Sequence, residues 1–453
     1  MKFIFSLTIC FFLLLGIVFG EEKSESTLNM FPFPVESYTL SNGMEVVLIK
    51  YGTNGTVMDL LTVDVGGGNE KKPDEIEYTH LMEHLIFRGS KNYSVKDVEK
   101  IYTKYGIYDQ GFTANDFTCY YRIFPKDSFE SLTKIMADKL INLNFTEEEY
   151  KAETGAVIGE YLGHYQMPTS RLWSKLHETA FTVHPYRDMP EHLEVLKKMP
   201  ENMDRVMKFY HDYYKPNNCR LVVVGDFDTE QVKEIINTNY GILKPGKVLP
   251  EVPQEPPQEK ELTGEVKFPG KTSPYIMISY RIPAYDLNNI DIPSINMIKE
   301  LYFTEASSIY KRLIYEEKLA TSIYFPEYYF CKYEALFSTQ IKLKKAEDIE
   351  KVKEIFFEEI DKIKKNIPDG EKLEEIKEKN RYKRLTNIDS LERISFTFMD
   401  YYFLSRDPDG INKYFKQYLR ITPEDLKKTL KKYFVEKHRT VITLTEKESK
   451  QHE

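Results

Sequence analysis

A proline-dense stretch, PGKVLPEVPQEPP at residues 245–257, divides the chain into two segments of similar length. Proline fits neither a helix interior nor a central strand, because it lacks a backbone N–H and fixes φ. The stretch therefore predicts an extended linker. A chain of 453 residues is also long for one hydrophobic core. We expect a first domain at residues 32–244, a linker at 245–262 and a second domain at 263–448.

Hydrophobic periodicity predicts a similar order of strands and helices in the two segments. In the first, strands are expected at 44–49, 57–65 and 221–224, and helices at 75–87, 95–105, 128–143 and 147–165. In the second, strands are expected at 275–282 and 440–444, and helices at 293–303 and 346–365. Strand–helix–strand units are too few for a parallel sheet, so the expected fold class is α+β. Two distantly repeated halves fit this order, and two unrelated domains are the alternative.

The N-terminal segment differs from the rest of the chain. Lys2 precedes an apolar run that ends at Phe19, and the small residue Gly20 suits a cleavage site, so residues 1–20 predict a signal peptide. The protein would then be secreted or periplasmic, with no other membrane association. An uncleaved N-terminal anchor is the alternative, because about 18 apolar residues can span a bilayer.

Charge and cysteine content exclude two further classes. The formal net charge is −8 and no basic stripe is present, which argues against a nucleic-acid partner. Without the leader, three widely spaced cysteines remain, and an odd number without a paired motif predicts no disulfide framework. We expect them to be small buried residues, namely Cys119, Cys219 and Cys331.

His80, Glu83 and His84 form the pattern that carries chemistry. On a helix at about 100° per residue, the three side chains project from one side. Two imidazoles on consecutive turns can then bind one zinc ion while the carboxylate between them reaches a water. The alternative is that these are surface histidines beside a solvated glutamate and bind no metal. The apolar flanking residues argue against it, because a buried polar trio without partners would be costly.

A catalytic zinc site needs a third protein ligand, for which an oxygen donor fits. Glu153 and Glu160 are two helical turns apart on one face, separated by about 10 Å along the axis. Both cannot bind one ion. One is expected to be the ligand, and the other to support a ligand from behind or to line the substrate cleft.

The second segment keeps the helix of this pattern without its metal-binding residues. If Phe303 is set against Phe87, the positions of His80, Glu83 and His84 are taken by Asn296, Lys299 and Glu300.

Together these residues resemble the pitrilysin (M16) family of zinc metallopeptidases. Within it, the chain is similar to the bacterial two-half subgroup related to the beta subunit of the mitochondrial processing peptidase. Besides the two glutamates, the segments that carry the resemblance are EYTHLMEHLIFRGSKNYS (77–94), DFTCYY (116–121), HPYR (184–187) and FYHDYYKPNNCRLVVVGDFD (209–228).

The resemblance implies two similar halves, each an antiparallel sheet with helices packed on it, that form a clamshell around a closed chamber. It implies one Zn²⁺ per chain, held by His80, His84 and Glu160, with Glu83 as the catalytic base. Glu153 would then support the ligands from behind. Peptide substrates would lie along an edge strand, where the substrate-binding residues are Gln110, Phe112 and Thr113.

One departure from the family bears on partners. Family members carry an Arg and a Tyr where this chain has Tyr315 and Thr321. The resemblance therefore implies a zinc-dependent endopeptidase that works as the catalytic subunit of a heterodimer with an Arg/Tyr-bearing paralogue, or as a homodimer. The alternative is a non-catalytic structural or peptide-binding subunit.

Overall fold

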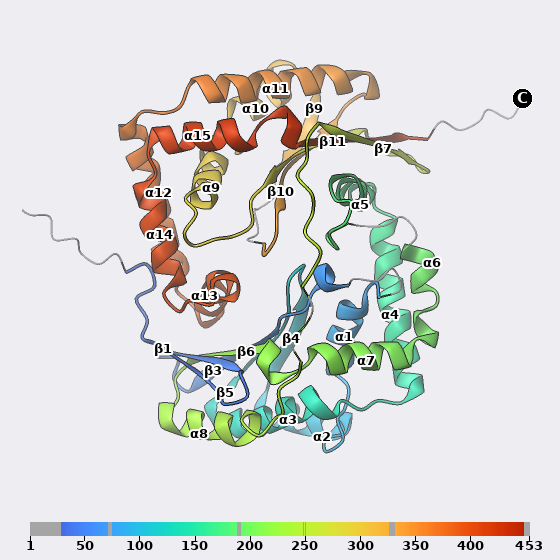
Figure 1. Ribbon diagram of the computed structural model, residues 1–453, viewed down its shortest axis with the longest axis vertical. Helices are drawn as coiled ribbons and strands as arrows, with labels where there is room; N and C mark the ends of the chain where they lie inside the picture. Colours follow the sequence, from blue (N-terminus) through green and yellow to red (C-terminus); the bar gives the residue numbers. More distant parts are fainter. Residues whose placement is uncertain are drawn as a thin grey trace, which may run out of the picture.

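The chain is described by a computed structural model that covers residues 29–70, 75–187, 192–247, 249, 251–325 and 331–447. It contains two β-sheets, each with its own set of helices (Figure 1). The α+β fold class is confirmed. The predicted signal peptide at residues 1–20 lies outside the described residues. Within the described residues, no helix is long and apolar enough to cross a membrane.

The first half is built on a six-stranded sheet with the order β1-β2-β6-β3-β5-β4. Its strands are β1 (Val35–Thr39), β2 (Glu45–Lys50), β3 (Thr56–Val63), β4 (Tyr108–Thr113), β5 (Thr118–Pro125) and β6 (Cys219–Gly225). Its helices are α1 (Tyr78–Ile86), α2 (Val95–Tyr105), α3 (Phe129–Asn142), α4 (Glu147–Tyr165), α5 (Pro168–Ala180), α6 (His192–Leu196), α7 (Met203–Tyr213) and α8 (Thr229–Tyr240).

The second half is built on a five-stranded sheet with the order β7-β11-β8-β10-β9. Its strands are β7 (Leu262–Phe268), β8 (Tyr275–Ile282), β9 (Ala320–Tyr324), β10 (Ala335–Leu343) and β11 (Arg439–Glu446). Its helices are α9 (Asp291–Tyr302), α10 (Ser308–Lys311), α11 (Ile349–Lys365), α12 (Gly370–Asn387), α13 (Leu391–Ser405), α14 (Gly410–Arg420) and α15 (Pro423–Tyr433), with a π-helical turn at Arg312–Glu316.

The two halves are repeats of one topology. The series β2-β3-α1-α2-β4-β5-α3-α4-α5 in the first half matches β7-β8-α9-α10-β9-β10-α11-α12-α13 in the second. Both sheets are antiparallel except for one parallel pair, β2 with β6 and β7 with β11. Each parallel pair joins the first strand of the series to a strand that returns after the helices, and such a return requires a crossover connection.

Each half lends a helix to the sheet of the other half, as Figure 1 shows. Helix α13 packs against β6 and β3, and α5 packs against β7 and β11. Leu172 and Leu176 of α5 are fully buried in one cluster with Met277 and Ile442 of the second sheet. One hydrophobic core likewise contains strand residues of the first sheet and residues of α13. The halves are therefore joined through shared cores.

The proline-dense stretch contains no helix or strand among its described residues, which run between α8 and β7. Two side chains tie it to the fold. The Glu255 carboxylate accepts hydrogen bonds from the backbone N–H groups of residues 182–184, at 2.8–2.9 Å. Gln258, which directly follows the stretch, is buried and its Nε2 donates to the carbonyl of Arg439 at 2.8 Å. The domain boundaries given above remain predictions.

Candidate metal centre

Helix α1 carries the predicted site, and a carboxylate from a preceding loop caps it. Glu77, just before the helix, has a left-handed backbone (φ 62°) and no side-chain cap. Instead, the Glu70 carboxylate accepts hydrogen bonds from the N–H groups of Glu77 and Thr79, each at 2.9 Å, and from the Thr79 hydroxyl. Burial raises the pKa of Glu70 to about 8. The apolar side chains of α1 are buried, whereas those of His80, Glu83 and His84 are only partly buried.

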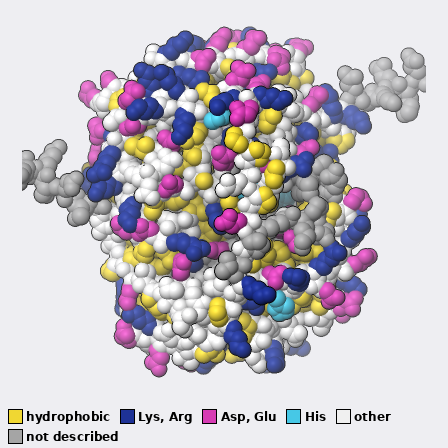
Figure 2. All heavy atoms as spheres, viewed as in Figure 1, with side chains coloured by type: hydrophobic (Ala, Val, Ile, Leu, Met, Phe, Trp, Pro, Cys, Tyr) yellow, Lys and Arg dark blue, Asp and Glu magenta, His cyan; other side chains and the backbone are white. Residues whose placement is uncertain are grey.

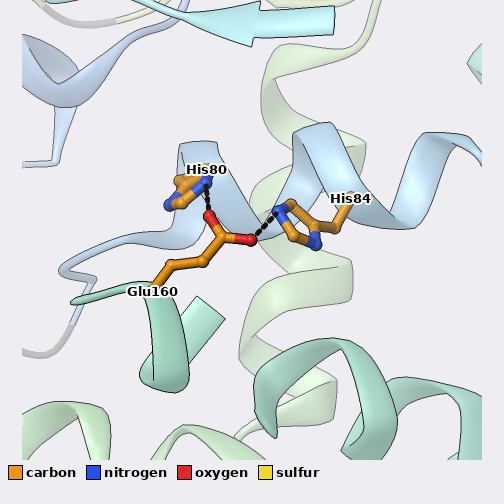
Figure 3. A group of neighbouring side chains, drawn as sticks. All are labelled: His80, His84 and Glu160. Atoms are coloured by element: carbon orange, nitrogen blue, oxygen red, sulfur yellow. Dashed lines mark ion pairs between the residues drawn. The ribbon is translucent and has the colours of Figure 1, made fainter. Parts of the chain in front are cut away.

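The structure brings His80, His84 and Glu160 together at the contact between α1 and α4 (Figure 3). Nε2 of His80 lies 3.4 Å from one Glu160 carboxylate oxygen, and Nε2 of His84 lies 3.8 Å from the other. One ligand atom from each residue falls within 4.8 Å of the other two. The Glu160 side chain is 52% exposed and that of His84 19%, so the cluster opens to solvent on the Glu160 side.

The second nitrogen of each imidazole is already engaged. Nδ1 of His80 lies 2.8 Å from Glu77, and Nδ1 of His84 lies 3.0 Å from Glu153. The hydrogen bond to Glu77 raises the pKa of His80, while burial acts in the opposite direction. Glu153 is also paired with Arg88. A carboxylate behind each imidazole fixes the ring orientation and leaves Nε2 for a metal, so the donor set fits a zinc ion with an open position.

Glu83 points toward the edge strand β4. Its Oε2 accepts a hydrogen bond from the Thr113 hydroxyl at 2.7 Å. Gly111 allows this close approach, because a Cβ at that position would meet Cγ of Glu83 at 3.1 Å and the Tyr120 ring at 3.3 Å. The second carboxylate oxygen of Glu83 has no hydrogen bond within the described part of the chain. The strand that is expected to hold substrate therefore lies beside the expected base.

The expected substrate-binding residues divide between the two faces of β4. Thr113 lies on the face toward Glu83, and Gln110 and Phe112 lie on the opposite face, because side chains alternate along a strand. The Phe112 ring packs toward the second half, with its centroid 6.3 Å from that of Phe396. Gln110 is exposed. Strand β4 pairs only with β5, so its other edge is open to an added strand within the described fold.

The second half has no equivalent metal cluster among its described residues. Helix α9 occupies the topological place of α1, and it carries Asn296, Lys299 and Glu300, as the alignment of the two segments predicts. Tyr315 is 62% exposed on the π-helical turn. Thr321 lies on the edge strand β9, where its hydroxyl donates to the Lys342 carbonyl at 3.3 Å.

Four supporting residues were not found by sequence reasoning: Glu70, Glu77, Arg88 and Gly111. Glu77 stands three residues before His80, and Arg88 four residues after His84. Their side chains therefore share the helix face of the histidines, and this spacing could have revealed them. No local signal marks Glu70, because it reaches α1 from a separate loop.

Comparison with known proteins gives matches to both halves of the chain. The family model described as Insulinase (Peptidase family M16) matches residues 46–189, and the model described as Peptidase M16 inactive domain matches residues 201–380. Zinc protease PqqE of Helicobacter pylori is 23% identical over 414 residues, which are 90% of this chain and 92% of that protein.

Two solved structures share the fold. A protease from Helicobacter pylori superimposes with a TM-score of 0.82 at 24% identity, over 91% of this chain and 99% of that chain. The periplasmic protease PqqL from Escherichia coli gives a TM-score of 0.73 at 18% identity, over 91% of this chain and 47% of that chain. The chain thus corresponds to about half of the second protein.

Proposed function

The chain belongs to the M16 family of zinc proteases, and from this premise we propose that it is a zinc-dependent endopeptidase that cleaves peptides or unfolded polypeptides. His80, His84 and Glu160 would hold one zinc ion, and Glu83 would act as the general base. The observation that carries the proposal is the convergence of two Nε2 atoms on the Glu160 carboxylate, at 3.4 and 3.8 Å, with both Nδ1 atoms held by carboxylates.

Zinc bound by these residues would supply Lewis-acid polarisation of the scissile carbonyl and of a water. Glu83 would act as the general base with its free oxygen, taking a proton from the attacking water and delivering it to the leaving amine. Thr113 orients the Glu83 carboxylate through the hydrogen bond to its other oxygen. An extended peptide that pairs with the open edge of β4 would pass beside Glu83, because Gly111 has no Cβ and lets the strand lie close to that side chain.

We assign Glu153 to the orientation of His84, and Gln110, Phe112 and Thr113 to the strand that binds peptide. Phe112 would contact substrate through its backbone, since its ring faces away from Glu83. Tyr315 lacks the charged guanidinium of the family's Arg, and Thr321 is too short to place a hydroxyl where the family's Tyr does. A paralogous M16 partner would supply these groups to the site, and a second copy of this chain is the alternative partner.

A non-catalytic role is the competing function. The match of residues 201–380 to a model described as an inactive domain gives it some support. The cluster in the first half argues for an enzyme, because a structural subunit has no use for a base placed between two metal-binding imidazoles. A secreted or periplasmic location is part of the proposal. It rests on the N-terminal pattern and on the likeness to a periplasmic protease of Escherichia coli.

Four variants separate the ligands from the base. His80→Ala, His84→Ala and Glu160→Gln are expected to lose zinc, while Glu83→Gln keeps it and loses hydrolysis by a factor of about 10²–10⁴. Metal content by mass spectrometry and cleavage of a quenched fluorescent peptide check this split. An active Glu83→Gln enzyme would refute the mechanism, and a wild-type chain that binds zinc without cleaving any peptide would favour the non-catalytic alternative.

The partner is tested by steady-state peptide hydrolysis with the zinc-loaded chain alone and with an Arg/Tyr-bearing M16 paralogue from the same genome. Loss of one oxyanion donor costs about 3 kcal/mol, so the chain alone is expected to be slow and the pair fast. A full rate without the paralogue, unchanged when it is added, would contradict this part of the proposal.

A further inference from the structure

A cavity of about 900 Å³ lies between the two halves, apart from the metal cluster. Helices α9, α12, α13 and α14 of the second half line most of it, and residues 112–117 of the first half complete it, with the exception of Thr113. None of His80, Glu83, His84 or Glu160 lines this cavity. It is therefore a separate concave site.

The cavity occupies the place that the metal cluster has in the first half. Helices α9 and α12 are the topological counterparts of α1 and α4. The α9 side chains in the cavity are those of Asn296, Lys299 and Glu300, which are the counterparts of His80, Glu83 and His84. From α12 come residues 380, 383, 384 and 387, which share one helix face at the spacing of successive turns. Both halves therefore have two polar helix faces directed inward, but the residues on these faces differ between the halves.

Basic groups predominate on these two helix faces. Lys299, Lys383 and Arg384 line the cavity, and Glu300 is the one carboxylate that α9 and α12 contribute to its lining. None of the three cations forms an ion pair within the described residues. Arg384 donates to the Tyr401 hydroxyl at 2.9 Å and stacks on the Tyr401 ring, 5.4 Å from its centroid, so its guanidinium is held in place.

The opposite side of the cavity carries four phenylalanines together with the carboxylates of Asp116 and Asp400, and it continues from the substrate strand. Phe112, Phe117, Phe396 and Phe403 line it, and the rings of Phe117 and Phe403 lie 4.1 Å apart. Phe112 and Ala114 flank Thr113, whose hydroxyl is bonded to Glu83. A peptide extended along β4 past Glu83 would therefore reach the cavity directly beyond the end of the strand.

We propose that this cavity binds a carboxylate-bearing, apolar segment of the peptide substrate, with the carboxylate near Lys299, Lys383 and Arg384 and the apolar side chains against the phenylalanines. The inference rests on the proposed peptidase function and gives it a preference for substrates with a free C-terminus or an acidic side chain near the cut. Asp400 and several asparagine amides also face the space, and they suit the N–H and C=O groups of a peptide.

Binding is measured by fluorescence anisotropy with the full-length, zinc-loaded chain that carries Glu83→Gln, so that peptide is not turned over. The probes are a labelled pentapeptide of leucine and phenylalanine with a free α-carboxylate, its C-terminal amide, and an amide with one internal glutamate. We expect the free acid to bind at least about tenfold more tightly than the plain amide, as a charge-assisted hydrogen bond provides. The glutamate probe then tells a terminal carboxylate from a side-chain one.

Lys383→Met and the double variant Lys299→Met/Lys383→Met should reduce the preference for the acid toward one. Lys379→Met is the matched control, because it removes an exposed lysine of the same helix outside the cavity. Equal binding of acid and amide by the starting chain overturns the proposal. So does a preference that survives the double variant but disappears with a chelator, since the carboxylate then binds at the metal. A chain that cleaves peptides without this preference would refute the cavity assignment alone. Absence of cleavage by the zinc-loaded chain with Glu83 intact, both alone and with the paralogous partner, would refute the proposed function.

Discussion

The Thr113 hydroxyl lies 2.7 Å from Oε2 of Glu83, although the two residues are 30 positions apart. This hydrogen bond joins the end of the edge strand β4 to the polar face of α1. The same contact requires a glycine at position 111, where a Cβ would press on Glu83 at 3.1 Å. The Thr113 side chain therefore fixes the position of the expected general base, Glu83, relative to the expected substrate strand, β4.

Thr113→Val keeps the shape of the side chain and removes the hydrogen bond to Glu83. We expect kcat to fall about tenfold or more, because a hydrogen bond to a charged group contributes about 1.5–3 kcal/mol. Zinc content should not change, since Thr113 touches no expected ligand. Thr113→Ser retains the hydroxyl and should retain most of the rate, so steady-state kinetics of the two variants give the test. Equal rates for both would show that Thr113 does not orient the base.

Glu153→Ala removes the carboxylate behind His84. Loss of such a support typically weakens metal affinity 10- to 100-fold. Competition with a chelating dye measures this change. Arg88→Met is the matched control, because it removes the other partner of Glu153 and leaves the contact to His84 in place. Comparable affinity losses in both variants would mean that the ion pair, and not the imidazole contact, matters for metal binding.

His184 predicts a limit to acid stability. It is 1% exposed between the rings of Tyr186 and Tyr333, and burial lowers its pKa to about 4 from the usual 6.5. Its Nδ1 accepts a hydrogen bond from the Tyr186 N–H at 3.0 Å. The unfolded chain takes up a proton at a higher pH than the folded chain does. The contribution of the neutral His184 ring to the free energy of unfolding is therefore complete above pH 6.5. It is lost as the pH falls toward 4, by about 1.4 kcal/mol per pH unit.

His184→Phe keeps a ring in place and removes the titration. Its unfolding free energy should fall less steeply than that of the unchanged chain between pH 6.5 and 4, whatever the difference between the two at neutral pH. Urea unfolding at several pH values measures both slopes. Parallel slopes would show that His184 is not responsible for the acid loss.

A cut in the linker should leave the two halves together. A protease site placed at residues 253–254 opens the chain next to Glu255, while α5 and α13 remain buried in the sheet of the opposite half. The nicked protein is expected to elute from gel filtration as the uncut chain does, because core contacts of this kind outlast the loss of one covalent link. Leu176→Ala combined with the nick should weaken the association, since a buried leucine contributes about 2–5 kcal/mol. Two separately eluting fragments from the simple nick would contradict shared cores.

Much of the fold could be predicted from local patterns. The expected ranges 95–105, 147–165 and 275–282 coincide with α2, α4 and β8. Their amphipathic or apolar runs lie within each element, and the capping residues Ser94 and Thr146 directly precede the two helices. Helices α5 to α8, α10 and α12 to α15 were not predicted. Helix α12 is mostly polar on every side, so its periodicity is weak, and α5 gains its partners only from the sheet of the second half.

The candidate site was likewise predicted in part from local patterns, and the rest was decided by packing. The spacing of His80, Glu83 and His84 on one helix is a local property, so the sequence predicted their shared face. The choice between Glu153 and Glu160 could not be made from spacing, because both lie on one face of α4. The packing of α4 against α1 places Glu160 at the Nε2 atoms and Glu153 at Nδ1 of His84.

The sequence by itself determined what is encoded within a few turns of chain. These features are the helix pattern of the metal site, the proline-dense break, and the repeat that has other residues at the positions of His80, Glu83 and His84. Only the tertiary structure decided which distant groups complete these features. The Glu70 cap, the Thr113 contact to Glu83, the exchange of α5 and α13, and the cavity between the halves all join residues far apart in sequence. Local periodicity specifies which face of an element is buried, but the partner that buries it is selected by packing over the whole chain.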